Sequence, residues 1–182
     1  MVGQAQMSVH EYAAAEQSFR RMLELAPGQR EGRFYLGGAY LKQGKEDAAL
    51  AEWRKAADDE PRYFPAVFAV GAVLAGRREY SEARQWLARA VALNPNHAFT
   101  RFELGRIAHH EKNYAEAERE LLAATRLAPE LKEASYLLAS TYRQLGKIQE
   151  AQLEAARGKR LYGQTLQRDV DLLKQALGGA KQ

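Results

Sequence analysis

Apolar residues recur along the chain in pairs of short blocks, each at helical spacing. In one pair, the two blocks are Phe34, Leu36 and Tyr40, then Ala49, Trp53 and Ala56. A spacing of three or four residues puts apolar side chains on one face of a helix. Polar turns, such as Gln43-Gly44-Lys45, separate the two blocks. The pattern predicts pairs of short antiparallel helices.

These pairs repeat at a fixed interval of 34 residues, which four of the five prolines mark. The interval is marked by Pro27, Pro61, Pro95 and Pro129, by Gly3, Gly37, Gly71 and Gly105 with Ala139 next, and by Ala15, Ala49, Ala83, Ala117 and Ala151. Proline ends a helix because it lacks an amide donor and excludes helical geometry from the residue before it. Small residues let two helix backbones approach closely. One helix pair cannot bury its apolar faces alone, so stacked pairs must share a core.

With the proline counted as position 32, the repeat resembles the tetratricopeptide repeat. That family favours a large apolar residue at position 7, a small one at 8, aromatics at 11 and 24, and alanine at 20 and 27. The repeat at 30–63 matches throughout, with Leu36, Gly37, Tyr40, Ala49, Trp53, Ala56 and Pro61. The repeats at 64–97 and 98–131 match nearly as well. The resemblance implies an all-α, right-handed superhelical solenoid of antiparallel helix pairs.

Both ends depart from the pattern. The repeat at 132–163 loosens toward its end, where Gly163 replaces the proline. Residues 164–178 predict a separate C-terminal capping helix, followed by a tail at 179–182. One face of that helix carries Leu166, Val170, Leu173 and Leu177. The first repeat, 1–29, is partial and starts inside its first helix. Truncation from a longer chain is favoured over a stunted repeat.

The resemblance also implies a peptide-binding site. In the family, positions 2, 5, 9, 12 and 13 of each first helix usually face a concave groove. The candidate groove residues are Phe34, Gly38, Leu41, Phe68, Ala72, Phe99, Phe102, Arg106, His109, Tyr136, Ser140 and Arg143. Position 5 is aromatic in every complete repeat, which suits an apolar or amphipathic segment, and the arginines suit acidic groups on it. The alternative is that these rings pack between neighbouring first helices.

Catalytic and metal-binding motifs are missing from the sequence. There is no cysteine, nucleophile elbow, phosphate loop or zinc-protease motif. His109-His110-Glu111 does not suit a metal ion, because adjacent helical residues point about 100° apart. The lysine and asparagine pattern of family members that grip chaperone tails is also absent. We therefore expect no metal, no cofactor and no enzymatic activity.

Charge and hydropathy narrow the partners further. The net charge is +4, and the densest basic stretch is Arg157, Lys159 and Arg160, with Arg168 further on. This scattered excess disfavours nucleic acid as a partner. No apolar run is long enough to span a bilayer, and the N-terminus does not resemble a secretory signal. The chain as given is expected to be soluble and cytoplasmic, or periplasmic if a signal has been removed.

Together these patterns predict a scaffold for protein interaction or assembly that binds a peptide or helix of a partner in its groove. Two alternatives stay open. The chain could self-associate as a homo-oligomer through its N-terminal edge or its fifth repeat. It could instead be the accessory repeat region of a larger enzyme or of an envelope-biogenesis protein.

Overall fold

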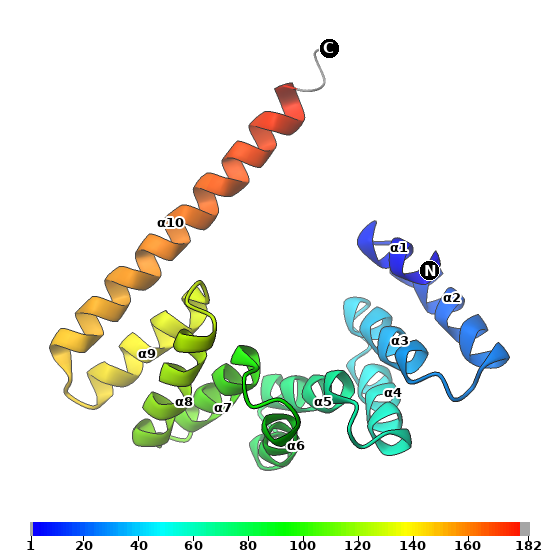
Figure 1. Cartoon of the computed structure of the whole chain (residues 1–182), viewed down its shortest axis with the longest axis horizontal. Helices are drawn as coiled ribbons and strands as arrows, with labels where there is room; N and C mark the ends of the chain where they lie inside the picture. The colour runs from blue at the N-terminus through cyan, green and yellow to red at the C-terminus, as the bar shows by residue number, and fades with distance from the viewer. Residues whose placement is uncertain (1, 179–182) are drawn as a thin grey trace. The chain divides into compact units, whose positions relative to one another are not determined.

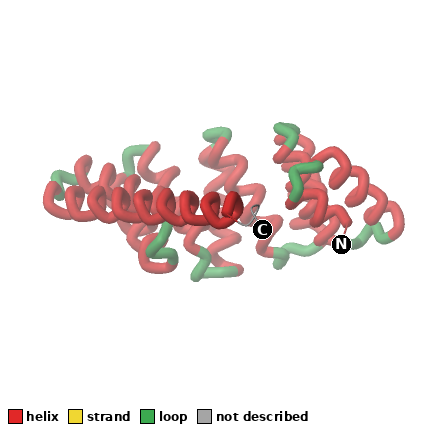
Figure 2. Tube along the Cα trace, turned by 90° about the horizontal axis from the view of Figure 1, so that it is seen from above, coloured by secondary structure: helices red, strands yellow, loops and turns green. Residues whose placement is uncertain are grey.

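The structure, a computed structural model, describes residues 2–178, and over that range it has ten α-helices and no strand (Figures 1 and 2). The predicted tail at 179–182 and the side chains of Leu173 and Leu177 lie outside the described part. The chain divides into two compact units, residues 1–95 and 96–182. The predicted fold class, an all-α array of antiparallel helix pairs, is confirmed.

Each unit is built from consecutive helix pairs. The first unit contains α1 (Val2–Ser8), α2 (Tyr12–Leu25), α3 (Arg30–Lys42), α4 (Glu46–Asp59), α5 (Phe64–Gly76) and α6 (Tyr80–Leu93). The second contains α7 (Ala98–His110), α8 (Tyr114–Leu127), α9 (Lys132–Gln144) and α10 (Ile148–Gly178). Within each unit, every helix packs on the next one in the chain. The contacts are therefore local in sequence.

The periodic prolines stop the second helix of each of the first four pairs. Helix α4 ends at Asp59, two residues before Pro61, and α8 ends at Leu127, two residues before Pro129. The residue between helix and proline is extended, with φ −138° and ψ 95° at Glu60. Proline forces this geometry on its predecessor, so the period of the prolines becomes the period of the helix pairs.

The turns inside the helix pairs share a left-handed residue. Positive φ values occur at the same place in five successive pairs, at His10, Gly44, Arg78, Lys112 and Gly146. Glycine adopts this conformation without strain, whereas other residues incur a cost. The turn geometry is thus kept in every repeat even where glycine is missing.

Lys112→Gly should therefore stabilise the chain. Relief of left-handed strain is worth about 1–2 kcal/mol, and the greater freedom of glycine in the unfolded chain offsets about half of it. We expect the free energy of unfolding in urea to rise by roughly 0.5 kcal/mol. Gly44→Ala is the matched control and should lower it by about 1 kcal/mol. A loss of stability in Lys112→Gly would show that its side chain matters more than its backbone.

Glycine in the first helix of each of the first four pairs admits a large side chain from the second helix. A Cβ atom built on Gly105 would lie 2.7 Å from Leu121 Cγ, and one built on Gly71 would lie 2.8 Å from Leu87 Cγ. Both distances are too short for real atoms. In the last pair, Ala139 takes the glycine position and Ala155 the position of the large residue. The size of the residue in the second helix thus determines how large the facing residue of the first helix can be.

Helix α10 differs from the prediction. A helix does cover residues 164–178, but it is the continuation of α10 and not a separate capping helix. No proline follows Ile148, and Gly163 alone cannot end the helix, because an interior glycine costs only about 1 kcal/mol relative to alanine. A single 31-residue helix therefore takes the place of two predicted helices, the second helix of the last repeat and the capping helix.

Candidate peptide-binding surface

Three of the predicted groove aromatics are half-buried and belong to the cores. Phe34 and Phe68 pack against a cluster that includes Ala56, Val67 and Ala90, and Phe102 packs against two core clusters of the second unit. Phe34 also meets the Tyr63 ring edge-on, with centroids 5.9 Å apart. Tyr63 directly precedes α5, so the start of the next helix pair covers the ring. For these three rings, the contacts support the alternative in which the rings pack against neighbouring helices.

The two remaining aromatics are exposed. Phe99 on α7 is 51% exposed, and Tyr136 on α9 is 43% exposed. One side of the Tyr136 ring rests on α10 at Gly158, where a Cβ atom would lie 3.0 Å from Tyr136 Cε1. No helix pair follows to cover its other side in the described chain. These two rings are the most exposed members of the predicted aromatic row.

Beside Phe99 lies a cavity that the sequence did not indicate. It has a volume of about 300 Å³, and its lining comprises Phe99, Ala128, Glu130, Leu131, Lys132, Glu133, Thr165 and Arg168. Phe99 comes from α7, and Thr165 and Arg168 come from α10. The last two were missed because residues 164–178 were interpreted as a solvated cap. Only the unbroken course of α10 brings them to the start of α9.

The polar groove candidates of the second unit lie toward the C-terminal ends of α7 and α9. His109 Nδ1 lies 3.0 Å from Thr141 Oγ1, which ties α7 to α9. Burial, with a smaller effect of His110, lowers the pKa of His109, which favours the neutral ring. Ser140 is half-buried beside this pair, and Arg143 is exposed.

The two arginine candidates differ in availability. Arg106 forms an ion pair with Glu103 on its own helix. Burial raises the pKa of Glu103, and the Arg106 charge opposes that shift. Arg143, and likewise Arg168 beside the cavity, has no ion pair or side-chain hydrogen bond within the described chain. Arg143 is thus the predicted cation best able to meet an acidic ligand.

The candidate groove residues Gly38, Leu41 and Ala72 of the first unit have small or apolar side chains. Gly38 and Ala72 are half-buried, and Leu41 lies at the edge of exposure. A Cβ atom on Gly38 would meet only Met7, at 3.9 Å. This face offers room and apolar contact, but it has no cation among the predicted residues. The second unit therefore combines more of the features that a specific ligand requires.

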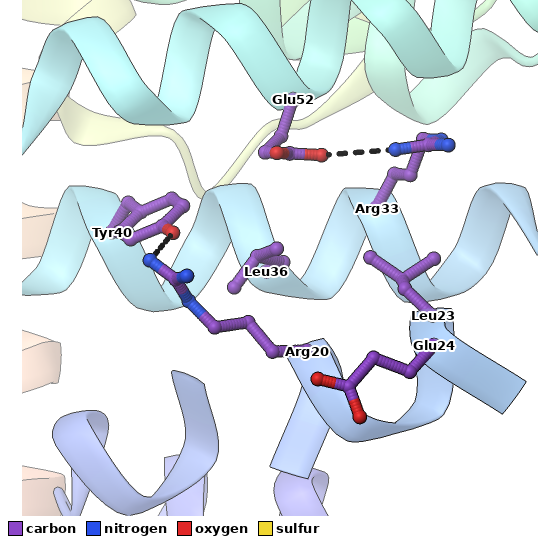
Figure 3. Close-up of a pocket in the computed structure, with 7 residues that line it drawn as sticks. All are labelled: Arg20, Leu23, Glu24, Arg33, Leu36, Tyr40 and Glu52. Atoms are coloured by element: carbon purple, nitrogen blue, oxygen red, sulfur yellow. Dashed lines mark hydrogen bonds and ion pairs between the residues drawn. The ribbon is translucent and has the colours of Figure 1, made fainter. Parts of the chain in front are cut away.

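A second pocket, of about 350 Å³, lies among α2, α3 and α4 (Figure 3). Its charged groups are already engaged with one another or with neighbours. Arg20 Nη2 donates to Tyr40 Oη at 2.7 Å, and Arg33 Nη1 lies 3.4 Å from Glu52 Oε2. The remaining lining carboxylate, Glu24, pairs with Arg21. These mutual pairs make the pocket part of the scaffold's own structure.

The Arg33–Glu52 pair recurs two repeats later. Arg101 and Glu120 occupy the equivalent positions there, and their charged groups are 3.0 Å apart. In the last repeat, Ser135 occupies the position of the arginine, and Glu154 occupies that of the glutamate. Ser135 Oγ and Glu154 Oε2 are buried without a hydrogen-bond partner in the described chain.

Arg157 supplies the missing guanidinium from α10. It lies 3.2 Å from Glu154 Oε1 and donates to Pro129 O at 3.0 Å. Arg33 donates to Pro27 O at the same distance, 3.0 Å, three periods earlier. Arg157 therefore belongs to the internal framework, which leaves the basic stretch near it with one fewer cation for outside partners.

Two further properties of the described residues bear on function. No group of three or more His, Cys, Asp or Glu residues could hold a metal ion there. None of the helices in the described range is both long and apolar enough to cross a membrane.

The stacked helix pairs define a helical-repeat scaffold. The tetratricopeptide-repeat family model matches residues 2–62, 39–98, 74–131 and 102–164. The chain therefore belongs to the tetratricopeptide-repeat family, as its resemblance predicted. By class it is a scaffold for protein–protein interaction.

Several known proteins are similar. Anaphase-promoting complex subunit 3 from Schizosaccharomyces pombe is 27% identical over 139 residues, which are 75% of this chain and 21% of that protein. This chain thus spans about a fifth of its relative's length. A crystal structure of MamA aligns with a TM-score of 0.79 at 18% identity, covering 92% of this chain and 98% of that one. MamA from Desulfovibrio magneticus RS-1 gives 0.79 at 19% identity, covering 90% and 92%. These structures share the fold.

Proposed function

We propose that the surface formed by α7, α9 and the adjoining part of α10 binds an apolar or amphipathic segment of a protein partner that carries acidic groups. The observation that carries this proposal is the pair of exposed rings, Phe99 and Tyr136, beside a cavity. Exposed aromatics next to a concave site are typical anchors of protein interfaces. Subunit 3 of the anaphase-promoting complex is named as part of an assembly, which fits a role in holding proteins together.

The charges around this surface favour an acidic ligand. Arg143 stands at the C-terminal end of α9, and Arg168 stands at the cavity beside the start of α9. Glu130 and Glu133 also line the cavity, so a ligand with one basic residue there would be accommodated. Glu133 is one helical turn before Tyr136, which makes the cavity and the exposed ring one continuous surface. The ligand we expect is therefore an aromatic or aliphatic anchor flanked by acidic residues.

Peptide display on the intact chain tests this proposal. Selected peptides should carry apolar anchors with acidic neighbours. In fluorescence anisotropy, Tyr136→Ala and Arg143→Glu should each weaken binding of such a peptide about tenfold, because each removes an anchor or reverses a charge.

Leu153→Ser is the control, since Leu153 is an exposed residue of α10 outside this surface. It should leave the affinity unchanged, and circular dichroism should show all three variants folded. If Tyr136→Ala and Arg143→Glu bind as tightly as Leu153→Ser, the ligand surface lies elsewhere.

A further inference from the structure

The last part of α10 projects beyond its packing partners. Thr165 and Arg168 are the last residues of α10 that line the cavity beside α9. The described side chains after Arg168 are all exposed, from Asp169 to Leu172 and at Lys174 and Gln175. This segment continues a helix whose earlier turns pack on α9. Its described apolar side chains are exposed to water.

An apolar stripe runs along this projecting segment. Leu166 is 55% exposed and Val170 is 36% exposed, and they are four residues apart. In the sequence, leucines at positions 173 and 177 continue the spacing by three and then four. This alternation is the a/d pattern of a two-stranded coiled coil, with Gly163 and Val170 at a positions and Leu166 at a d position.

Charge placement favours a second copy of the same chain. In this register Asp169 occupies a g position and Lys174 the e position five residues later. In a parallel pair of identical helices, each Asp169 faces Lys174 of the other copy, which gives two opposite-charge contacts by symmetry. In an antiparallel pair g positions face g positions, so Asp169 would not meet Lys174 of the other copy. The Asp169–Lys174 contacts therefore form only in the parallel arrangement.

The same helix discourages stacking of another repeat. Thr125 of α8 is buried, and the equivalent residue of α10, one period later, is Lys159, which is exposed. A lysine at this position opposes burial under a further helix pair, because its charge would lose water without gaining a partner. Lys159 therefore opposes a dimer formed by stacking a further helix pair on α10.

We infer that residues 163–177 of α10 form a parallel two-stranded coiled coil with the same segment of a second copy. The contact is short, so the dimer forms at elevated protein concentration. Thr165 and Arg168, which line the proposed peptide site, fall at c and f positions away from the seam, so the dimer and the peptide site use different faces of α10. Failure of the dimer would therefore not affect the proposed peptide site.

Sedimentation velocity of the intact chain over a range of concentrations tests this inference. The wild type should change from monomer to dimer as the concentration rises. Asp169→Lys should raise the dimer Kd about fivefold or more, because it puts two like charges on each side of the seam. The double variant Asp169→Lys/Lys174→Asp should restore the wild-type Kd to within about twofold. Leu153→Ser, which lies before this segment on α10, should have no effect.

Three results would overturn the inference: a wild-type monomer at every concentration, a tighter dimer in Asp169→Lys, or a double variant as weak as the single one. A covalent test is independent of charge. Since the chain has no cysteine, Leu166→Cys should form a disulfide-linked dimer on oxidation, because d positions meet across a parallel seam. Failure to cross-link at concentrations where the wild type dimerises would exclude the parallel register.

Discussion

Replacing Leu121 by Ala should lower the free energy of unfolding by about 3 kcal/mol, the range for emptying a buried leucine site. Leu121 is fully buried against Gly105. Gly105→Ala alone should cost about 1 kcal/mol, since overpacking exceeds the gain in helix propensity. In the Leu121→Ala background, the same change should become stabilising by about 1 kcal/mol, because the new methyl group then enters vacant space.

The chain already contains this double replacement. Ala139 and Ala155 occupy the equivalent positions in the last helix pair. Urea denaturation of the four proteins in the cycle measures the coupling, which should be about 2 kcal/mol. Effects that add to within about 0.5 kcal/mol would mean that the two residues do not determine each other's size.

Replacing Arg157 by Ala should cost about 2 kcal/mol, because it leaves the partly buried Glu154 carboxylate and the Thr125 and Pro129 carbonyls without their cation. This figure is below that for a fully buried pair, since both side chains are partly exposed. Thermal unfolding measures the loss. The physical reason is the desolvation of the Glu154 carboxylate, whose second oxygen already lacks a partner in the described chain.

Moving the arginine back to the first helix provides the control. Ser135→Arg in the Arg157→Ala background rebuilds the arrangement of Arg33 and Glu52 and should recover at least half of the lost stability. Ser135→Arg in the wild type should destabilise, because Arg157 already occupies that space. If Ser135→Arg has the same effect in both backgrounds, Arg157 does not substitute for the missing arginine.

Most of the fold could be predicted from the sequence because each repeat uses local signals. Pro61 and Pro129 end helices wherever they occur, and Gly105 admits a large neighbour whatever lies beyond it. The course of α10 was harder to predict, since Gly163 resembles a helix end when read alone. Whether a glycine stops a helix depends on the residues that continue it.

The candidate site was predicted less completely, because exposure depends on the neighbouring helix pair. Phe34 and Tyr136 occupy the same repeat position, yet Tyr63 covers the first and no later pair covers the second in the described chain. The sequence places both on the first-helix face and cannot distinguish them there. Likewise, no local pattern reveals that Arg157 takes over a role held by Arg33, since the two come from different helices.

Binding of a partner segment on the α7–α9 surface is tested most directly by a backbone NMR titration with a display-selected acidic peptide. We expect the largest amide shift changes to cluster around Phe99, Tyr136 and Arg143, with little change in α8. Shift changes concentrated on α8, or on the pocket around Arg20 and Tyr40, would contradict this expectation.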